Sequence, residues 1–173
     1  LRTFLGEVRQ LGPEYFVSVS KRVDPVFEPC VIQQKLLAEG KTPVIRFENV
    51  NGSKLPLTSN LFGSYELLGL ALGVDPGTPK SEILGRFRER VQKPRAPVEI
   101  ARENAPVKQV VYKDGDIDLG KLPILQHAEM DSGKYITVGC LVIRDPDSGV
   151  LNAGIYRHMV QGKDRIGAMF NPA

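Results

Sequence analysis

The sequence predicts an α+β protein in which an amino-terminal α/β domain is followed by a β-rich unit. Over the first hundred residues, apolar side chains at helical spacing alternate with short β-branched runs. Three prolines, Pro94, Pro97 and Pro106, then interrupt any regular element. Long segments rich in β-branched and aromatic residues follow. We therefore expect one domain at 1–105 and the start of a second at 106–173.

The first domain is expected to alternate helices and strands. An amphipathic helix should occupy 1–11, because Phe4, Leu5 and Val8 recur at helical spacing before Gly12. The later expected elements are a strand at 15–19, a helix at 26–39 with Pro29 in its first turn, strands at 44–47 and 55–58, a helix at 64–72 capped by Ser64, and a helix from an N-cap at Thr78 through Pro79 to residue 91.

The second unit is expected to be mainly strands, at 107–112, 136–144, 150–160 and 165–170. The residues from Asp145 to Gly149 supply turn chemistry between the second and third of these strands. The sequence therefore predicts a β-hairpin there. These strands are too few to close a barrel, so the chain is expected to be part of a longer protein.

Composition argues against several classes of function. The 173 residues include 23 basic and 20 acidic side chains scattered along the chain, so no surface for nucleic acid is expected. Cys30 and Cys140 lie far apart and have neither metal-ligand nor redox spacing. No run approaches the roughly 20 apolar residues of a membrane helix, and no export signal opens the chain. We expect a cytoplasmic protein that does not enter a membrane.

The strand at 150–160 contains the strongest candidate site residues. Asn152 offers an amide oxygen that suits a divalent cation, and Arg157 can hold a carboxylate or phosphate bidentately. Taken alone, an asparagine bonded to the backbone and an exposed arginine are the commoner situations. Strict alternation places Asn152 and Arg157 on opposite faces, and a bulge near Gly154 would bring them to one site.

The other candidates carry weaker signals. His127 and His158 form no ligand cluster, and we assign neither a catalytic role. Glu129 and Asp131 resemble an acid–base pair, but a solvated loop is the favoured interpretation. Met169 would ordinarily be a core residue, as would Phe170.

Several short motifs occur in the order found in one known family. They are Val23-Asp24-Pro25, Phe47 to Lys54, Asn60 to Ser64, Leu122 to Leu125, Asp131 to Thr137 and Asn152 to Arg157. Through them nearly the whole chain resembles the UbiD family of prenylated-FMN-dependent decarboxylases. The resemblance implies that the second unit begins a split β-barrel of the flavin-reductase-like kind, and that this chain is the amino-terminal portion of the enzyme.

The resemblance also implies a reaction and a cofactor. The reaction is reversible, non-oxidative decarboxylation of an aromatic, heteroaromatic or α,β-unsaturated carboxylic acid, with carbon dioxide as product. Prenylated FMN serves as electron sink, and Mn²⁺, with K⁺ nearby, links the flavin phosphate to the protein. The family's full-length members form homo-oligomers. Its remaining metal ligands and its proton donor would lie past residue 173, so the fragment alone is expected to be inactive.

The resemblance assigns roles to particular residues. Arg157 would be catalytic and would also contact the cofactor, and Asn152 would ligate the metal. The other cofactor contacts would be Ile155, Tyr156, Met169, Phe170 and Asn171.

Two alternatives remain open. The chain could belong to a non-catalytic flavin-binding or scaffold subunit of a multi-subunit carboxylase, which UbiD-like chains also resemble. It could instead be an ordinary FMN-binding split barrel with oxidoreductase activity, although such a protein needs no metal-ligating residue at Asn152.

Overall fold

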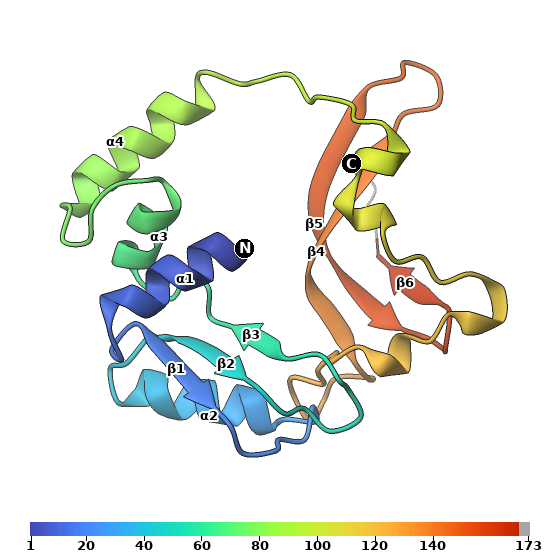
Figure 1. The fold of residues 1–173 in the computed structure, drawn as a ribbon, viewed down its shortest axis with the longest axis horizontal. Helices are drawn as coiled ribbons and strands as arrows, with labels where there is room; N and C mark the ends of the chain where they lie inside the picture. Colours follow the sequence, from blue (N-terminus) through green and yellow to red (C-terminus); the bar gives the residue numbers. More distant parts are fainter. Residues whose placement is uncertain (170–173) are drawn as a thin grey trace. The chain divides into compact units, whose positions relative to one another are not determined.

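The computed structural model describes residues 1–169 and contains helices together with two three-stranded sheets (Figure 1). The helices are α1 (Arg2–Leu11), α2 (Glu28–Ala38), α3 (Tyr65–Ala71) and α4 (Lys80–Val91), and the strands are β1 (Phe16–Val19), β2 (Val44–Phe47), β3 (Leu57–Ser59), β4 (Tyr135–Arg144), β5 (Leu151–Val160) and β6 (Ile166–Ala168). The sheet orders are β1-β2-β3 and β4-β5-β6. The α+β prediction is confirmed, whereas the split barrel stays a prediction.

A small apolar core joins α1 and α3 to the first sheet. Val8, Phe16, Val44 and Leu67 are at most 9% exposed and pack together. The spacing that predicted α1 reflects this packing, because Val8 is the residue of that helix that is fully buried. α3 begins where predicted, with the Ser64 hydroxyl accepting a hydrogen bond from the Leu67 amide at 3.4 Å.

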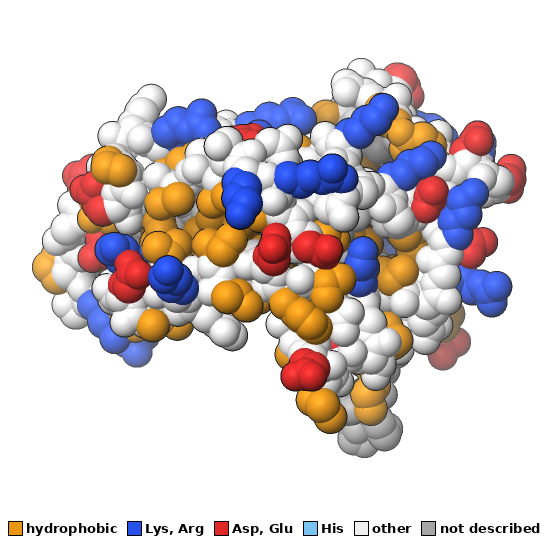
Figure 2. All heavy atoms as spheres, turned by 90° about the horizontal axis from the view of Figure 1, so that it is seen from below, with side chains coloured by type: hydrophobic (Ala, Val, Ile, Leu, Met, Phe, Trp, Pro, Cys, Tyr) orange, Lys and Arg blue, Asp and Glu red, His pale blue; other side chains and the backbone are white. Residues whose placement is uncertain are grey.

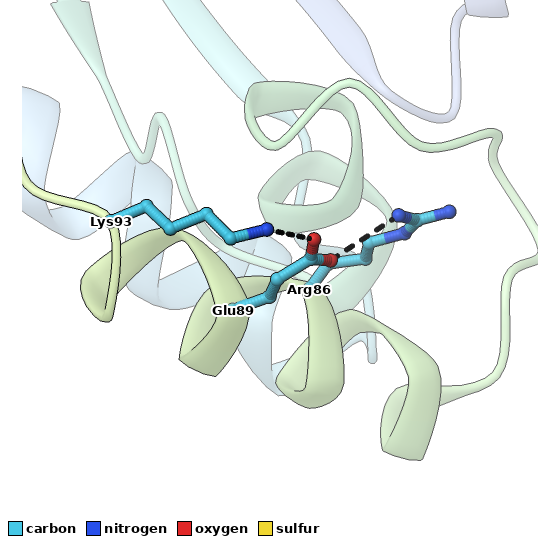
Figure 3. Close-up of polar contacts among 3 residues, drawn as sticks. All are labelled: Arg86, Glu89 and Lys93. Atoms are coloured by element: carbon cyan, nitrogen blue, oxygen red, sulfur yellow. Dashed lines mark hydrogen bonds and ion pairs between the residues drawn. The ribbon is translucent and has the colours of Figure 1, made fainter.

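The start of α4 differs from the prediction. The N-cap residue is Pro79, and the Thr78 hydroxyl instead donates to the Asp75 carbonyl at 2.6 Å within the preceding turn. The predicted cap at Thr78 is therefore wrong, because that hydroxyl is engaged locally. Near the other end of α4, Glu89 accepts hydrogen bonds from Lys93 at 3.0 Å and Arg86 at 3.4 Å (Figure 3). These spacings place oppositely charged side chains on one helix face.

The predicted strand at 107–112 is also wrong. Residues Pro106–Lys108 form a 3₁₀ turn, in which the Lys108 and Gln109 amides donate to Ala105 and Pro106. The apolar side chains that suggested a strand are exposed, with Val107 at 79% and Val110 at 69%. These amides bond within the turn and not to a neighbouring strand, and β-branched residues form a strand only where a partner strand accepts them.

The predicted hairpin is confirmed. β4 and β5 are antiparallel, and Asp145 closes the turn by accepting from the amides of Ser148 at 2.7 Å and Asp147 at 2.9 Å. These hydrogen bonds hold the pKa of the Asp145 carboxyl below its usual range. Pairing is regular from Arg144↔Leu151 to Gly139↔Tyr156, and the register then shifts between Gly139 and Ile136, which pairs with His158. The extra residue is in β4.

The chain divides into two compact units that are not continuous in sequence. One comprises 1–19, 35–46 and 58–116, and the other comprises 20–34, 47–57 and the residues from 117 onward. In the second unit, residue 23 pairs with residue 50 and residue 26 pairs with residue 126, both in parallel. The boundary expected at 105/106 stays a prediction.

Charged side chains of both signs are mixed over the surface drawn in Figure 2, with apolar side chains between them. This distribution agrees with the small net charge of +3. Among residues 1–169, no helix combines the length and the apolar character that a membrane crossing requires.

Candidate functional site: the two faces of β5

The two faces of β5 differ in exposure. Gly154, Tyr156 and His158 are half-buried or buried, whereas Ala153, Ile155 and Arg157 are exposed. Ile155 is 73% exposed, and the Arg157 side chain is 62% exposed. The strand therefore presents an aliphatic side chain and a guanidinium together on one accessible face.

The Arg157 side chain has two partners. Its guanidinium carbon lies 4.4 Å from the centroid of the Tyr135 ring, a cation–π distance. Its Nη1 atom lies 3.6 Å from Oδ1 of Asp131. These contacts leave other N–H donors of the guanidinium accessible, because arginine carries five of them.

Asp131 is not a solvated loop residue, so the interpretation from the sequence is wrong for this carboxylate. Its side chain is 16% exposed. Its Oδ2 accepts from the amides of Ala128 at 3.0 Å and His127 at 3.3 Å. The Gln126 side chain adds a hydrogen bond to the Asp131 carbonyl at 3.1 Å. Burial raises the pKa of the Cys30 thiol, and the Asp131 charge raises it further.

The neighbours of β5 in the sheet are β4 and β6. β4 pairs with β5 along its length, and the described residues of β6 pair with 158–160.

Asn152 pairs with Ile143 in the regular part of the hairpin. The predicted bulge near Gly154 is absent, because Gly154 pairs in register with Leu141. Asn152 and Arg157 consequently alternate to opposite faces of β5. Within 1–169, no group of three or more His, Cys, Asp or Glu side chains could hold a metal ion.

Glycines on the less exposed face make room for rings. A Cβ on Gly139 would lie 2.6 Å from Nδ1 of His158, and a Cβ on Gly154 would lie 2.5 Å from the Tyr156 ring. His158 is 5% exposed, and its Nε2 atom has no hydrogen-bond partner among the described residues. The buried position supports the interpretation of His158 as a strand residue that packs in the sheet.

Met169, 80% exposed, is the last described residue, so its proposed role in cofactor binding stays a prediction. Phe170 and Asn171 lie outside the described residues. The sequence reasoning missed Tyr135 and Asp131 as partners of Arg157. Both residues lie in the motif from Asp131 to Thr137 that contributed to the family resemblance, but neither side chain was given a role.

Two family descriptions match successive parts of the chain. Residues 14–87 match "3-octaprenyl-4-hydroxybenzoate carboxy-lyase N-terminal domain", and residues 98–173 match "3-octaprenyl-4-hydroxybenzoate carboxy-lyase Rift-related domain". Both are domains of UbiD proteins. The chain belongs to the UbiD family. The resemblance stated from the motifs is thereby confirmed.

Curated UbiD relatives include named decarboxylases. An anhydromevalonate phosphate decarboxylase of Methanosarcina mazei is 37% identical over 99% of this chain and 36% of that protein. A phenolic acid decarboxylase of Sedimentibacter hydroxybenzoicus is 33% identical over 96% of this chain and 36% of that protein. The chain thus spans little more than a third of the length of the curated relatives it matches.

Solved structures of UbiD-class enzymes share the fold. The enzyme HmfF from Pelotomaculum thermopropionicum in complex with FMN is 35% identical with a TM-score of 0.85, over 99% of this chain and 37% of that chain. An evolved dimeric form of HmfF in complex with prFMN is 34% identical with a TM-score of 0.86, over 99% of this chain and 38% of that chain.

Proposed function

We propose that the full-length protein catalyses reversible, non-oxidative decarboxylation of an aromatic, heteroaromatic or α,β-unsaturated carboxylic acid with prenylated FMN. Arg157 on the exposed face of β5 carries the proposal, because a permanently charged guanidinium is suited to a departing carboxylate or a flavin phosphate. The bound flavin would supply the electron sink for the reaction. This chain's residues would bind and orient the cofactor and the acid.

The exposed face of β5 fits a flavin. Ile155 offers apolar surface for a planar ring, and Arg157 lies two residues further on the same face. Cofactor sites combine apolar walls with a few placed polar groups, which is the character of this face. Tyr156 points the other way, so its contribution would come from its backbone. Met169, Phe170 and Asn171 remain proposed cofactor contacts.

Asn152 lies on the face of β5 opposite to Arg157. Asn152 would supply one amide oxygen to Mn²⁺. The described residues do not complete a metal site, so Mn²⁺ and K⁺ rest on the resemblance and no step is derived through them.

The relatives' names agree on the type of reaction but differ in the substrate. One name specifies a phosphorylated acid and another a phenolic acid, and both reactions remove a carboxylate. The shared requirement is a cation beside that carboxylate, which Arg157 meets. We further propose a cytoplasmic homo-oligomer as the working form of the full-length protein, without nucleic acid or membrane as partner.

The first experiment is FMN binding to the full-length protein, followed by fluorescence, with and without Mn²⁺. Decarboxylation of a phenolic acid and of an α,β-unsaturated acid is then assayed with prenylated FMN. We expect metal-dependent flavin binding and an activity that Arg157→Ala reduces by about a hundredfold or more, as for the loss of a charged group at a reacting centre.

Arg165→Ala is the matched control, because Arg165 lies in the same sheet region with its side chain 83% exposed and pairs only weakly with Asp164 at 3.7 Å. Flavin binding without decarboxylation of either acid would support the scaffold-subunit alternative. Flavin binding that is the same with and without Mn²⁺, together with flavin-dependent reductase activity, would support an ordinary FMN-binding barrel and contradict the proposal.

A further inference from the structure

We propose that Asp131 and Tyr135 are positioning residues that hold the Arg157 guanidinium in one orientation for its ligand. The inference rests on the proposed function of Arg157 as the group that meets the flavin and the substrate carboxylate. It concerns what fixes this side chain in place before either ligand binds.

Arg157 needs such support because of where it lies. Its side chain is 62% exposed and extends from a strand rather than from a buried pocket. A free arginine side chain loses rotamer entropy when a ligand fixes it. Prior contacts reduce that loss, so a guanidinium that is already oriented binds its anion more tightly.

Asp131 is itself rigidly held. Both carboxylate oxygens have partners, because Oδ2 accepts two loop amides and Oδ1 lies 3.6 Å from Arg157. The Asp131 amide also donates to the Ala128 carbonyl at 3.1 Å. A carboxylate fixed by its own loop can direct a flexible cation, whereas two mobile side chains would gain little from pairing.

Tyr135 lies on the face of Arg157 because of the bulge in β4. Its amide donates to the Leu125 carbonyl at 2.8 Å, which fixes the start of the strand. Tyr135 pairs with Met159, two residues from Arg157 and therefore on its face. If the register of Gly139↔Tyr156 continued without the bulge, Tyr135 would oppose Val160 and its ring would lie on the other face.

The two contacts restrict different motions of the guanidinium. The Tyr135 ring lies against the guanidinium carbon, and Asp131 lies near Nη1 at one end. The Arg157 side chain is still 62% exposed, so its remaining N–H donors stay available to a planar anion such as a carboxylate. The cluster therefore orients Arg157 without blocking it.

The test uses FMN affinity of the full-length protein for two matched pairs of variants. Tyr135→Leu removes the ring, and Tyr135→Phe keeps it. Asp131→Asn removes the charge, and Asp147→Asn removes the charge of an exposed residue in the hairpin turn. We expect Tyr135→Leu and Asp131→Asn to weaken FMN binding about three- to tenfold, with both controls within about twofold.

A double-mutant cycle separates positioning from general damage to the fold. In an Arg157→Ala background, Asp131→Asn and Tyr135→Leu should have no further effect on FMN affinity, because they act through Arg157. Equal losses in both backgrounds would overturn the proposal. Thermal unfolding of each variant identifies any that fail to fold. If one of Asp131→Asn and Tyr135→Leu does not fold, the cycle of the other with Arg157→Ala tests the proposal.

A direct measurement distinguishes failure of this inference from failure of the proposed function. NMR relaxation of the Arg157 Nε–H group in ¹⁵N-arginine-labelled protein should show a restricted side chain that becomes mobile in Tyr135→Leu and Asp131→Asn. If Arg157→Ala leaves FMN binding unchanged, the proposed function of Arg157 is wrong. An equally mobile Arg157 in wild type and variants would overturn the positioning role whatever the FMN result.

Discussion

The α1–α3 core and the β4–β5 hairpin are ordered by different interactions. In the core, Val8, Phe16, Val44 and Leu67 come from four separate elements and are almost completely buried. In the hairpin, two ten-residue strands pair along their length, yet Val138, Val142 and Ile155 are more than 60% exposed. Burial of apolar side chains stabilises the core, and backbone hydrogen bonds between the strands stabilise the hairpin.

This difference relates to function. In a region stabilised by buried side chains, using those side chains to bind a ligand would cost stability. A region stabilised by its backbone hydrogen bonds can leave side chains such as Ile155 and Arg157 exposed to a ligand. The contrast predicts that substitutions in the core act on stability, and that exposed hairpin substitutions act mainly on binding.

The largest stability effect should come from Leu67→Ala. Leu67 is fully buried in the core, so its truncation should reduce the free energy of unfolding by about 2–5 kcal/mol. Chemical denaturation of the full-length protein measures this. Leu68→Ala, at a neighbouring position that is 37% exposed, is the control and should cost distinctly less. Equal costs would mean that the core is not the stabilising region.

Gly139→Ala tests the one hairpin face that is packed. The new methyl group would meet the His158 ring at 2.6 Å, so we expect a loss of about 1–3 kcal/mol in the free energy of unfolding. Gly85→Ala in α4 is the control, because nothing lies within 4 Å of its added Cβ and a helix favours alanine. A further His158→Ala substitution should recover part of the loss. A harmless Gly139→Ala would show that this face is loosely packed.

Ser64→Ala tests a local contribution next to the core. The substitution removes the hydroxyl that accepts from the Leu67 amide and should cost about 1 kcal/mol in the free energy of unfolding. Ser81→Ala, in the first turn of α4, is the matched control and should change stability by less than about 0.5 kcal/mol. If the two variants melt at the same temperature, the Ser64 cap does not stabilise α3.

The smallest effect is expected at Glu89. The hydrogen bond and charge of Lys93, with a further contribution from Arg86, hold the pKa of the Glu89 carboxyl below its usual range. A lowered folded-state pKa stabilises the fold above the unfolded pKa, and this contribution is lost as pH falls through the folded value. Lys93→Met should therefore raise the Glu89 pKa toward normal in an NMR titration, whereas Lys108→Met should not.

Local signals in the sequence predicted most elements correctly. α1 followed from apolar spacing that ends at Gly12, and α3 followed from Ser64 at its N-cap. The hairpin followed from the turn residues around Asp145. Each of these features depends on neighbours in sequence, which is why a single sequence was enough to locate them.

The errors arose where distant residues decide the structure. The segment at 107–112 has strand-like composition but pairs with no strand among the described residues, and its first residues form a 3₁₀ turn. The bulge predicted near Gly154 is wrong. The register shift lies between Ile136 and Gly139 in β4 instead, because pairing register depends on both strands.

The candidate site was predicted in part. Arg157 and Ile155 do lie together on an accessible face, as their spacing in a strand requires. The partners of Arg157 were not predicted, since a loop residue, Asp131, reaches it only through the fold of that loop. The roles proposed for Arg157 and Ile155 stay predictions, as do those proposed for Asn152, Tyr156 and Met169.

The extra residue between Ile136 and Gly139 also bears on how this hairpin tolerates changes in length. Deleting either Thr137 or Val138 would remove one exposed side chain. It would also shift the register by one residue, so that Tyr135 and Ile136 would each move to the face of the sheet opposite to the one it occupies now. Substituting either residue leaves that arrangement intact. A library of variants should therefore accept many side chains at these two positions and reject single-residue deletions there.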